Sequence, residues 1–436
     1  MAVTQSARAP GLGASAGTDY GRPAKRPSWQ RRGFAAALVV SAAVFWHQPL
    51  GVGGEGEPAA AALEKAERHL RNRDFAQAIT ASTEAIRLNP TAAEARACRG
   101  AAYCATGDVV RALSDLNEAV RLDPRDPWAL CSRGIAHVLA GHHRAAIADL
   151  TAAINVAPRY APAFSNRGAA YAKLGENDKA IADLTAAIRL GGADAATFTS
   201  RGAAYSAKGE NDRALADLNE AIRLDPTFAQ AFYNRGVLNT DTRQLAAAVA
   251  DLTEAIRLGP GSAKFHGARG AALTLKGDLD QAIGDFSEAI RLEPGNAKAY
   301  CGRGSAYQMK GDRDRAVADY TEAARLGRGS AEAYYCQGLA RGAKGDLDGA
   351  LADFTEAIRL NPVLATARYS RGIAHAQKSD IGEAISDLDE AIRLDPKLAA
   401  AYQGRGVAYQ KKGDKGKAEE DFAQAKKLGY KPAQNP

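Results

Sequence analysis

The sequence predicts an all-α fold, a right-handed α-solenoid superhelix of tandem helix-turn-helix repeats. Glycines recur every 34 residues from Gly100 to Gly406 without one insertion or deletion, and a fixed period of this length is the signature of stacked repeats. Within each period, apolar residues follow the spacing of two amphipathic helices. The composition agrees, since 46% hydrophobic and 25% charged residues are typical of a globular chain.

The glycine spacing divides the chain into units and preceding segments. Residues 1–33 are expected to form a disordered basic N-terminal segment, 34–50 a hydrophobic signal or anchor segment, and 51–58 a flexible linker. Eleven repeats then cover 59–432, with units at 59–92, 93–126, 127–160, 161–194, 195–228, 229–262, 263–296, 297–330, 331–364, 365–398 and 399–432.

The net charge of +7 is concentrated at the N-terminus. Residues 1–33 contain six Lys and Arg against Asp19 alone, which leaves a net charge of only +2 on the other 403 residues. A chain so nearly balanced has no electrostatic footprint for a polyanion. We therefore expect no nucleic-acid partner.

The segment before the repeats has features of an export signal. Arg31 and Arg32 stand before thirteen mostly apolar residues, 34–46. Thirteen is short for a bilayer span, which needs about 20 residues, but it suits a secretory signal. The stretch Arg-Arg-Gly-Phe resembles a twin-arginine signal without the polar residues that usually follow it. Two interpretations stay open: a bacterial envelope protein, exported to the periplasm or tethered to the inner membrane through 34–50, and a cytoplasmic protein.

One unit, 195–228, shows how each repeat is built. The first helix carries small and aromatic residues at helical spacing, and the turn after it contains a glycine suited to a left-handed C-cap. The second helix carries alanine and leucine at helical spacing and ends at a proline. In chain order these residues are Phe198, Gly202, Tyr205, Gly209, Ala214, Leu218, Ala221 and Pro226.

This pattern resembles the tetratricopeptide repeat family, in its bacterial type. The family's small residue, Tyr, Ala, aromatic or Leu, Ala and Pro correspond to Gly202, Tyr205, Ala214, Leu218, Ala221 and Pro226, and both alanines recur in all eleven units. The resemblance implies a concave groove, lined by the first helices, that binds a partner protein or peptide. The sixth unit lacks the turn glycine, and the fourth and eighth lack the closing proline, so we expect loosened turns there.

An arginine precedes the recurring glycine in nine units. On a helical wheel, Arg201 falls inside the arc of Phe198 and Tyr205, which packs in the core. A buried charge without a partner costs several kcal/mol. We therefore expect a partner on the second helix, although a row of ligand-binding arginines is the alternative.

The partner that the sequence offers is an aspartate of the second helix. The first unit has Lys65 in place of the arginine and Ala81 in place of the aspartate, so the two residues are lost together. We expect structural ion pairs within units, and the pairs predicted by name are Arg201 with Asp217 and Arg235 with Asp251. In the ninth unit, Gln337 is expected to hydrogen-bond Asp353 instead.

The opposite face of the first helices varies between units and is the predicted binding surface. Its candidate partner-binding residues are Trp128, Asn166, Tyr233, Asn234, Met309, Tyr335 and Tyr369. Tyr335 and Tyr369 occupy the same place in adjacent units, so we expect them to form one aromatic patch beside Met309. Aromatic residues are favoured anchors of interfaces, although isolated exposed rings are also common.

The five cysteines, Cys98, Cys104, Cys131, Cys301 and Cys336, are expected to line the same face. They form no CxxC motif or Cys/His cluster, so no metal site is predicted. Neighbouring helices lie about 8–10 Å apart, which exceeds the Cα separation of about 7 Å that a disulfide allows. We therefore expect them to be unpaired.

No catalytic motif accompanies the repeats. The chain has no GxxxxGK[ST], HExxH or GxSxG sequence, and His142-His143 is expected to be a solvated pair in a turn. We predict a scaffold without cofactor or metal, not an enzyme. A cytoplasmic adaptor or assembly factor and a regulatory subunit of a separately encoded enzyme remain the alternatives.

Overall fold

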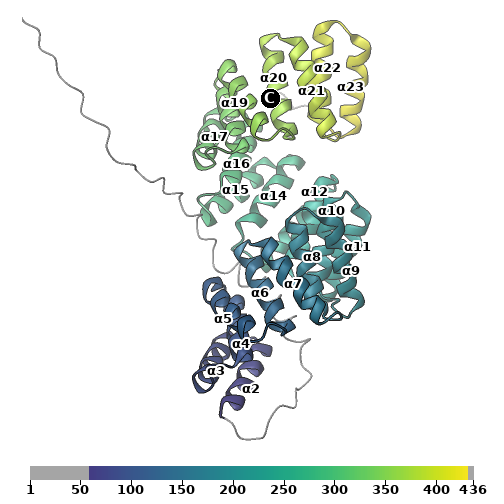
Figure 1. Ribbon diagram of the computed structural model, residues 1–436. Helices are drawn as coiled ribbons and strands as arrows, with labels where there is room; N and C mark the ends of the chain where they lie inside the picture. The colour runs from purple at the N-terminus through teal and green to yellow at the C-terminus, as the bar shows by residue number, and fades with distance from the viewer. Residues whose placement is uncertain (1–57, 431–436) are drawn as a thin grey trace, which may run out of the picture.

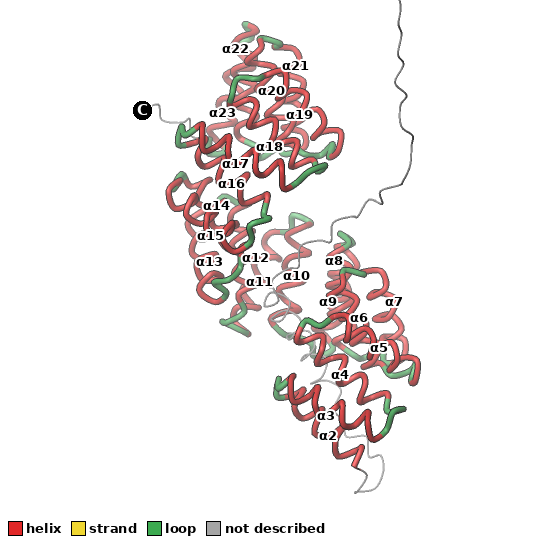
Figure 2. Tube along the Cα trace, turned by 90° about the vertical axis from the view of Figure 1, so that its left-hand side faces the viewer, coloured by secondary structure: helices red, strands yellow, loops and turns green. Residues whose placement is uncertain are grey.

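The computed structural model describes residues 58–430, which form 22 helices and, within that range, no strand (Figure 1, Figure 2). The first helices of the eleven units are α2 (Pro58–Arg71), α4 (Ala93–Thr106), α6 (Pro127–Ala140), α8 (Ala161–Lys173), α10 (Ala195–Ala207), α12 (Ala229–Asp241), α14 (Ala263–Lys276), α16 (Ala297–Met309), α18 (Ala331–Ala343), α20 (Ala365–Lys378) and α22 (Ala399–Lys412). The second helices are α3 (Phe75–Leu88), α5 (Val109–Leu122), α7 (His143–Val156), α9 (Asn177–Arg189), α11 (Asn211–Leu224), α13 (Leu245–Leu258), α15 (Leu279–Leu292), α17 (Arg313–Leu326), α19 (Leu347–Leu360), α21 (Ile381–Leu394) and α23 (Lys415–Lys427).

The helices stack as a solenoid, which confirms the predicted fold. Each first helix packs on its own second helix, and each second helix packs on the first helix of the next unit. First helices also contact the first helices of adjacent units, as α4 contacts α6. The repeats wind from α2 at one end to α23 at the other (Figure 1).

The recurring glycine allows the two helices of a unit to cross closely. A Cβ on Gly202 would lie 3.0 Å from Cγ of Leu218, and a Cβ on Gly100 would lie 2.6 Å from Cγ of Leu116. Real Cβ atoms do not approach side chains so closely, because interiors are already close-packed. The 34-residue glycine period therefore marks the point where the first helix meets the second.

The turns between the helices keep one conformation even where glycine is missing. Gly209 ends its turn with φ +77°, in the left-handed region that glycine adopts at little cost. In the sixth unit, Arg243 adopts φ 63°, and the amide of Gln244 donates to the Asn239 carbonyl at 2.8 Å. The expected loosening of this turn is wrong, because the hydrogen bonds at the helix end hold a non-glycine residue in the same geometry.

The units without a closing proline also keep their phase. Gly191 and Gly329 adopt φ 95° and 78° after α9 and α17. The next first helices begin at Ala195 and Ala331, one period apart from their counterparts. Gly191 ends α9 in the left-handed conformation in place of proline, whereas α17 ends at Leu326 and its C-cap Gly327 has φ −96°.

The buried core differs between the two ends of the chain. One continuous cluster of buried apolar residues runs from Ala66 to Ala170 through the first four units. In the later units the buried residues form separate, smaller clusters, of which the one around Phe286 is an example. The first helices of the early units are therefore joined to one another by apolar packing more completely.

The predicted segments 1–33 and 34–50, and the linker 51–58 except Pro58, lie outside the described residues. Pro58 begins α2 rather than ending a linker. Among the helices of residues 58–430, none is long and apolar enough to cross a membrane.

Candidate functional site

The structure brings Arg201 and Asp217 together within one unit. Nε of Arg201 donates to Oδ2 of Asp217 at 2.7 Å, and Nη2 donates to Oδ1 at 2.8 Å. The arginine side chain is 16% exposed and the aspartate side chain 9% exposed. This bidentate, partly buried arrangement is the strong form of an Arg–carboxylate pair, and the hydrogen bonds that Arg201 donates to Asp217 raise the pKa of its guanidinium.

The third nitrogen of the guanidinium reaches the preceding unit. Nη1 of Arg201 donates to Oγ1 of Thr185 on α9 at 3.1 Å. Arg235 repeats the arrangement with both oxygens of Asp251 and with Oδ1 of Asn219 on α11. Each arginine thus joins the two helices of its own unit to the second helix of the unit before it. The contact between units was missed by the sequence reasoning, although a Thr, Asn, Ser or Asp recurs two residues after the aspartate.

Nine arginines make this set of contacts. The Arg–Asp pairs are Arg99–Asp115, Arg133–Asp149, Arg167–Asp183, Arg201–Asp217, Arg235–Asp251, Arg269–Asp285, Arg303–Asp319, Arg371–Asp387 and Arg405–Asp421. The acceptors on the preceding units are Thr83, Asn117, Thr151, Thr185, Asn219, Thr253, Ser287, Thr355 and Asp389. In every one, Nε, Nη1 and Nη2 all donate within the repeat array.

The ninth unit breaks the series. Gln337 makes no hydrogen bond to Asp353, contrary to expectation. Nη1 of Arg341, one turn further along α18, lies 3.1 Å from Oδ2 of Asp353, but it does not donate a hydrogen bond to that oxygen. Burial therefore outweighs the attraction of Arg341 and raises the pKa of Asp353.

A disulfide lies beside this break, which corrects the expectation of unpaired cysteines. Cys301 on α16 and Cys336 on α18 are bonded, with Cα atoms 6.4 Å apart. The error came from using the distance between helix axes. Facing Cα atoms are closer than the axes, because each lies about 2.3 Å from its own axis.

The other three cysteines do not line an accessible face. Cys98, Cys104 and Cys131 are unpaired and have no exposed surface. Burial raises the pKa of the Cys98 and Cys104 thiols to about 12. They pack as small apolar residues and carry no reactive thiolate at neutral pH.

Two predicted binding residues are buried, so their assignment to an accessible groove is wrong. Trp128 is 6% exposed and Asn166 is 1% exposed. The Nδ2 of Asn166 donates to the Pro162 carbonyl at 2.8 Å, whereas its Oδ1 and the Nε1 of Trp128 have no hydrogen-bond partner. The helical wheel gave the direction of these side chains but not what covers them.

Tyr233 and Asn234 belong to a polar and aromatic cluster on α12 and α14. Lys264 donates to Oε1 of Gln230 at 2.6 Å, and its Nζ lies 4.6 Å from the centre of the Tyr233 ring. Gln230 in turn donates to Oδ1 of Asn234 at 2.6 Å. Tyr233 also packs on Phe265, with ring centres 5.3 Å apart. We name these five residues the Tyr233 cluster.

Lys264 was missed by the sequence reasoning, although a signal for it exists. It lies 34 residues after Gln230, at the same place of the next unit. Comparison of equivalent positions in neighbouring units therefore identifies Gln230 and Lys264 as candidates for a contact. Their hydrogen bond joins two adjacent units. A ligand bound to this face would also contact residues of more than one unit.

Tyr335 and Tyr369, the predicted aromatic patch, lie close enough for their phenol groups to interact electrostatically. Tyr335 packs on Phe354 of its own unit with ring centres 6.0 Å apart, whereas Tyr369 packs on the cluster that contains Leu388. Both rings are half-buried, and the structure has no ring contact between them. Met309 is 56% exposed and is the most accessible of the predicted binding residues.

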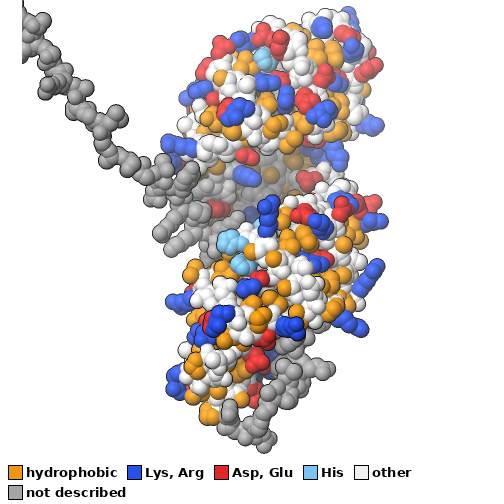
Figure 3. All heavy atoms as spheres, viewed as in Figure 1, with side chains coloured by type: hydrophobic (Ala, Val, Ile, Leu, Met, Phe, Trp, Pro, Cys, Tyr) orange, Lys and Arg blue, Asp and Glu red, His pale blue; other side chains and the backbone are white. Residues whose placement is uncertain are grey.

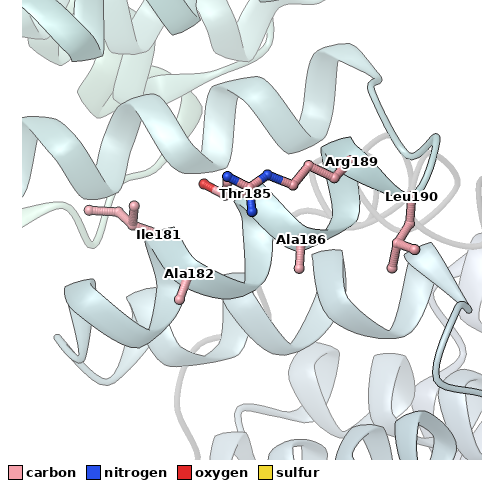
Figure 4. Close-up of a pocket in the computed structure, with 6 residues that line it drawn as sticks. All are labelled: Ile181, Ala182, Thr185, Ala186, Arg189 and Leu190. Atoms are coloured by element: carbon pink, nitrogen blue, oxygen red, sulfur yellow. The ribbon is translucent and has the colours of Figure 1, made fainter.

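The rest of the described surface carries charges of both signs (Figure 3) and a shallow pocket. Positive and negative side chains are interspersed over the face shown in Figure 3. No group of three His, Cys, Asp or Glu in residues 58–430 could hold a metal ion. A shallow pocket is lined by Ile181, Ala182, Thr185, Ala186, Arg189 and Leu190 (Figure 4). Because all six come from α9 and its end, it is a depression on one helix rather than an enclosed cavity.

Two histidines of the third unit, His137 and His142, lie close to each other. His142 is exposed, as expected for the turn, and its ring centre lies 5.8 Å from that of His137. His137 is near Asp149, with Nε2 to Oδ2 at 3.7 Å. Burial lowers the pKa of His137, so this side chain is predominantly neutral at pH 7.

Comparisons with known proteins agree with this geometry. A family model described as "Tetratricopeptide repeat" matches residues 63–127, 131–195, 301–365 and 335–399. A second, described as "TPR repeat", matches 202–242 and 270–311, and a third, again "Tetratricopeptide repeat", matches 399–428. No curated protein matches the chain.

Solved structures of other repeat proteins are similar to this chain to different degrees. A human IFIT1 dimer with PPP-AAAA has a TM-score of 0.51 at 14% identity, over 91% of this chain and 95% of that one. A repeat protein from Parabacteroides merdae covers 57% of this chain and 98% of its own, with 22% identity and a TM-score of 0.47. YrrB, described as having an unusual peptide-binding site, is 26% identical over 41% of this chain and 92% of its own, with a TM-score of 0.26. At these levels the likeness to IFIT1 concerns the fold alone.

Proposed function

Because the chain belongs to the tetratricopeptide repeat family, a fold that generally serves as a non-catalytic scaffold, we propose that it binds a partner protein or peptide in a concave groove formed by its first helices. The partner is a polypeptide, not a nucleic acid. The scaffold needs no cofactor or metal and has no enzymatic activity of its own.

The observation that carries this proposal is the contrast between repeated and varied positions. The arginines, aspartates and glycines that recur are engaged within the array, with the guanidinium nitrogens of Arg201 all donating to Asp217 and Thr185. The Tyr233 cluster occurs once and is formed by residues of two units. Aromatic rings with adjacent polar groups at the centre of a surface are typical of interface hot spots. We therefore place the partner site at the Tyr233 cluster, and we keep the exposed Met309 of α16 as a separate candidate contact.

Tyr335 and Tyr369 are secondary members of the proposed site. Their rings are half-buried on the packing side, so only one edge of each is available to a partner. Replacing them would disturb the stacking of α18 and α20 as well as binding. They are therefore weaker tests of the function than Lys264 or Met309.

We place the protein in the bacterial cell envelope, with residues 34–50 acting as an export signal or as a membrane anchor. The support is the order of Arg31-Arg32 before the apolar residues 34–46. The test is fractionation of cells that express the full chain or a chain without residues 1–50. Recovery of both forms in the cytoplasm would refute the location and leave the cytoplasmic adaptor.

The binding site is tested by charge reversal in the full chain. The variant Lys264→Glu should lose the partner that the wild-type chain retains in affinity purification, because it reverses the charge over the Tyr233 ring. Arg189→Glu is the matched control, since Arg189 is exposed at the end of α9, a second helix that contributes no residue to the Tyr233 cluster. Equal recovery of the partner by wild type and both variants would contradict the site. Recovery of an enzyme whose activity changes on binding would identify a regulatory subunit.

A further inference from the structure

Among the described units, three have a fourth residue whose side chain reaches a proline carbonyl of the unit before it. The proline belongs to the turn that joins the preceding second helix to the next first helix. The pairs are Arg96–Pro90 at 3.0 Å, His266–Pro260 at 3.2 Å and Tyr402–Pro396 at 3.4 Å. Of these three residue types, histidine is the one that changes its charge between about pH 5 and pH 8. The contact made by His266 is therefore the one that pH can control.

Both ring nitrogens of His266 face hydrogen-bond acceptors. Nδ1 lies 3.3 Å from Oδ1 of Asp285 on α15, and Nε2 lies 3.2 Å from the carbonyl oxygen of Pro260. His266 is 8% exposed, so water does not readily replace either partner. A neutral imidazole has one N–H donor, whereas the imidazolium has two. Only the charged ring can therefore make both hydrogen bonds.

The charged groups beside His266 belong to α14 and α15. Arg269 of α14 donates to both oxygens of Asp285. Glu288 of α15 interacts electrostatically with His266 and pairs with Arg291 of the same helix. Although burial opposes ionisation of Asp285, the hydrogen bonds from Arg269 and His266 lower its pKa. The carboxylate that faces the imidazole therefore stays ionised near neutral pH.

The turn that His266 contacts joins the sixth unit to the seventh. α13 ends at Leu258, and Glu254 and Arg257 near its end pair with each other. Pro260 follows between Gly259 and Gly261, and glycine gives the backbone conformational freedom. A hydrogen bond to the Pro260 carbonyl therefore restrains a turn that its sequence leaves flexible.

The same helix start carries part of the Tyr233 cluster. Lys264 and Phe265 immediately precede His266 in α14. Lys264 reaches across the junction to Gln230 of the sixth unit at 2.6 Å. Because His266 ties the first turn of α14 to both Asp285 and the preceding turn, it also fixes where Lys264 and Phe265 stand relative to the sixth unit.

We propose that His266 is a pH-sensitive link between the sixth and seventh units. The protonated ring joins Asp285 to the turn at Pro260, whereas the neutral ring gives up one of the two hydrogen bonds and the first turn of α14 loosens. The Tyr233 cluster is then more ordered at about pH 5.5 than at about pH 8. The consequence for partner binding rests on the proposed function, but the link itself does not.

Hydrogen exchange of the full chain, corrected for the intrinsic rate at each pH, tests the link without a partner. The amides of 265–270 should be about tenfold better protected at pH 5.5 than at pH 8, because a hydrogen bond to a charged group shifts a local opening equilibrium by roughly that factor or more. The amides of 197–202 are the internal control, since Phe198 takes the place of His266 in that unit. Equal protection of 265–270 at both pH values, or weaker protection at pH 5.5, would overturn the proposal.

Two variants separate the ring nitrogens from the packing of the side chain. His266→Phe is the matched change, because Phe198 and Phe232 occupy this place in two other units. It should fold and lose the pH dependence of 265–270. His266→Tyr should be well protected at both pH values, because the Tyr402 hydroxyl reaches the corresponding proline carbonyl and tyrosine does not titrate in this range.

The variants also define the results that contradict the link. A pH dependence of 265–270 that persists in His266→Phe would show that another group controls the junction. Protection in His266→Tyr no greater than in His266→Phe at pH 8 would show that the Pro260 carbonyl is not the partner that matters. Because no partner takes part in these measurements, either failure would leave the proposed binding at the Tyr233 cluster to be judged by its own test.

Discussion

The junctions before the fifth and the ninth units hold the same stacking by different chemistry. In the fifth unit, Arg201 binds Asp217 of its own unit and Thr185 of the preceding one. In the ninth, Gln337 makes neither contact, and the adjacent Cys336 is bonded to Cys301 of the preceding unit. The comparison shows that the arginine makes two kinds of contact, one within its own unit and one with the preceding unit. Where the arginine is missing, a disulfide links the two units instead.

The two kinds of link respond to different conditions. A bidentate ion pair in a partly buried site depends on both partners being present, because a single buried charge is costly. A disulfide depends on the redox environment and persists in oxidising compartments such as the periplasm. The fifth and ninth units should therefore differ in their response to mutation, reductant and pH.

The largest effect is expected from Arg201→Ala. It leaves the carboxylate of Asp217 buried without its partner, which should lower the free energy of unfolding by about 3–5 kcal/mol. Urea unfolding followed by circular dichroism, with hydrogen exchange of α10 and α11, measures it. Arg223→Ala is the control, because Arg223 pairs with Glu220 on the surface, and exposed i,i+3 pairs contribute little to stability. Equal losses in both variants would remove the distinction between buried and surface pairs.

Reduction of the Cys301–Cys336 bond is expected to have the next largest effect. A disulfide that closes a loop of this length, 35 residues in sequence, contributes about 2–4 kcal/mol. Unfolding of the wild-type chain in the presence and absence of reductant should show this loss, with faster hydrogen exchange in α16 and α18. The variant Cys301→Ser should unfold at one midpoint under both conditions. If reductant still lowered the unfolding midpoint of Cys301→Ser, the effect would not come from the Cys301–Cys336 disulfide.

Restoring the missing arginine should stabilise the ninth unit. In Gln337→Arg, the guanidinium can donate to Asp353 and to Thr321, as the other arginines do at their places. Hydrogen bonds to charged groups contribute about 1.5–3 kcal/mol, so unfolding should require more denaturant, most clearly with the disulfide reduced. Gln337→Lys is the matched control, since it adds the charge without the forked donors. A lysine variant as stable as the arginine variant would show that geometry is unimportant here.

A smaller effect is expected from the pH dependence of Asp353. Burial raises the pKa of its carboxyl above the ordinary value, so the folded state binds the proton more tightly than the unfolded state. Stability of the ninth unit should therefore rise as pH falls through the raised pKa, and this gain should be complete below the unfolded pKa. Asp353→Asn should abolish this contribution in unfolding curves measured across the acidic range. A loss of stability over the same range that depends on Asp353 would mean that its pKa is lowered instead.

Sequence reasoning predicted those features that a repeated pattern encodes. The 34-residue period gave the helix pairs and their phase, and the joint loss of arginine and aspartate in the first unit pointed to Asp217 as the neighbour of Arg201. The pattern did not show Thr185 as a third partner, because a hydroxyl two residues after the aspartate reads as an ordinary surface residue. It also could not show that Arg243 would adopt the left-handed turn conformation, which is imposed by hydrogen bonds rather than by residue type.

The candidate site was less predictable, because it depends on which side chains are buried by neighbouring units and on the distances between atoms of adjacent helices. A helical wheel gives the direction of Trp128 and Asn166 around their helices but cannot reveal that they are buried. It likewise gives no distance between facing Cα atoms, and this led to the wrong expectation for Cys301 and Cys336. Lys264 and Gln230 meet only when neighbouring units are stacked, so their contact became visible in three dimensions.

The most direct test of the structural role of the arginines is a double-mutant cycle on Arg201→Ala and Asp217→Ala, measured by unfolding and by partner binding on the same samples. A buried pair should give a coupling energy of about 1–3 kcal/mol in unfolding, with binding to the Tyr233 cluster unchanged in each folded variant. A coupling energy near zero, together with loss of partner binding in Arg201→Ala alone, would contradict the structural role and make the arginines a ligand site.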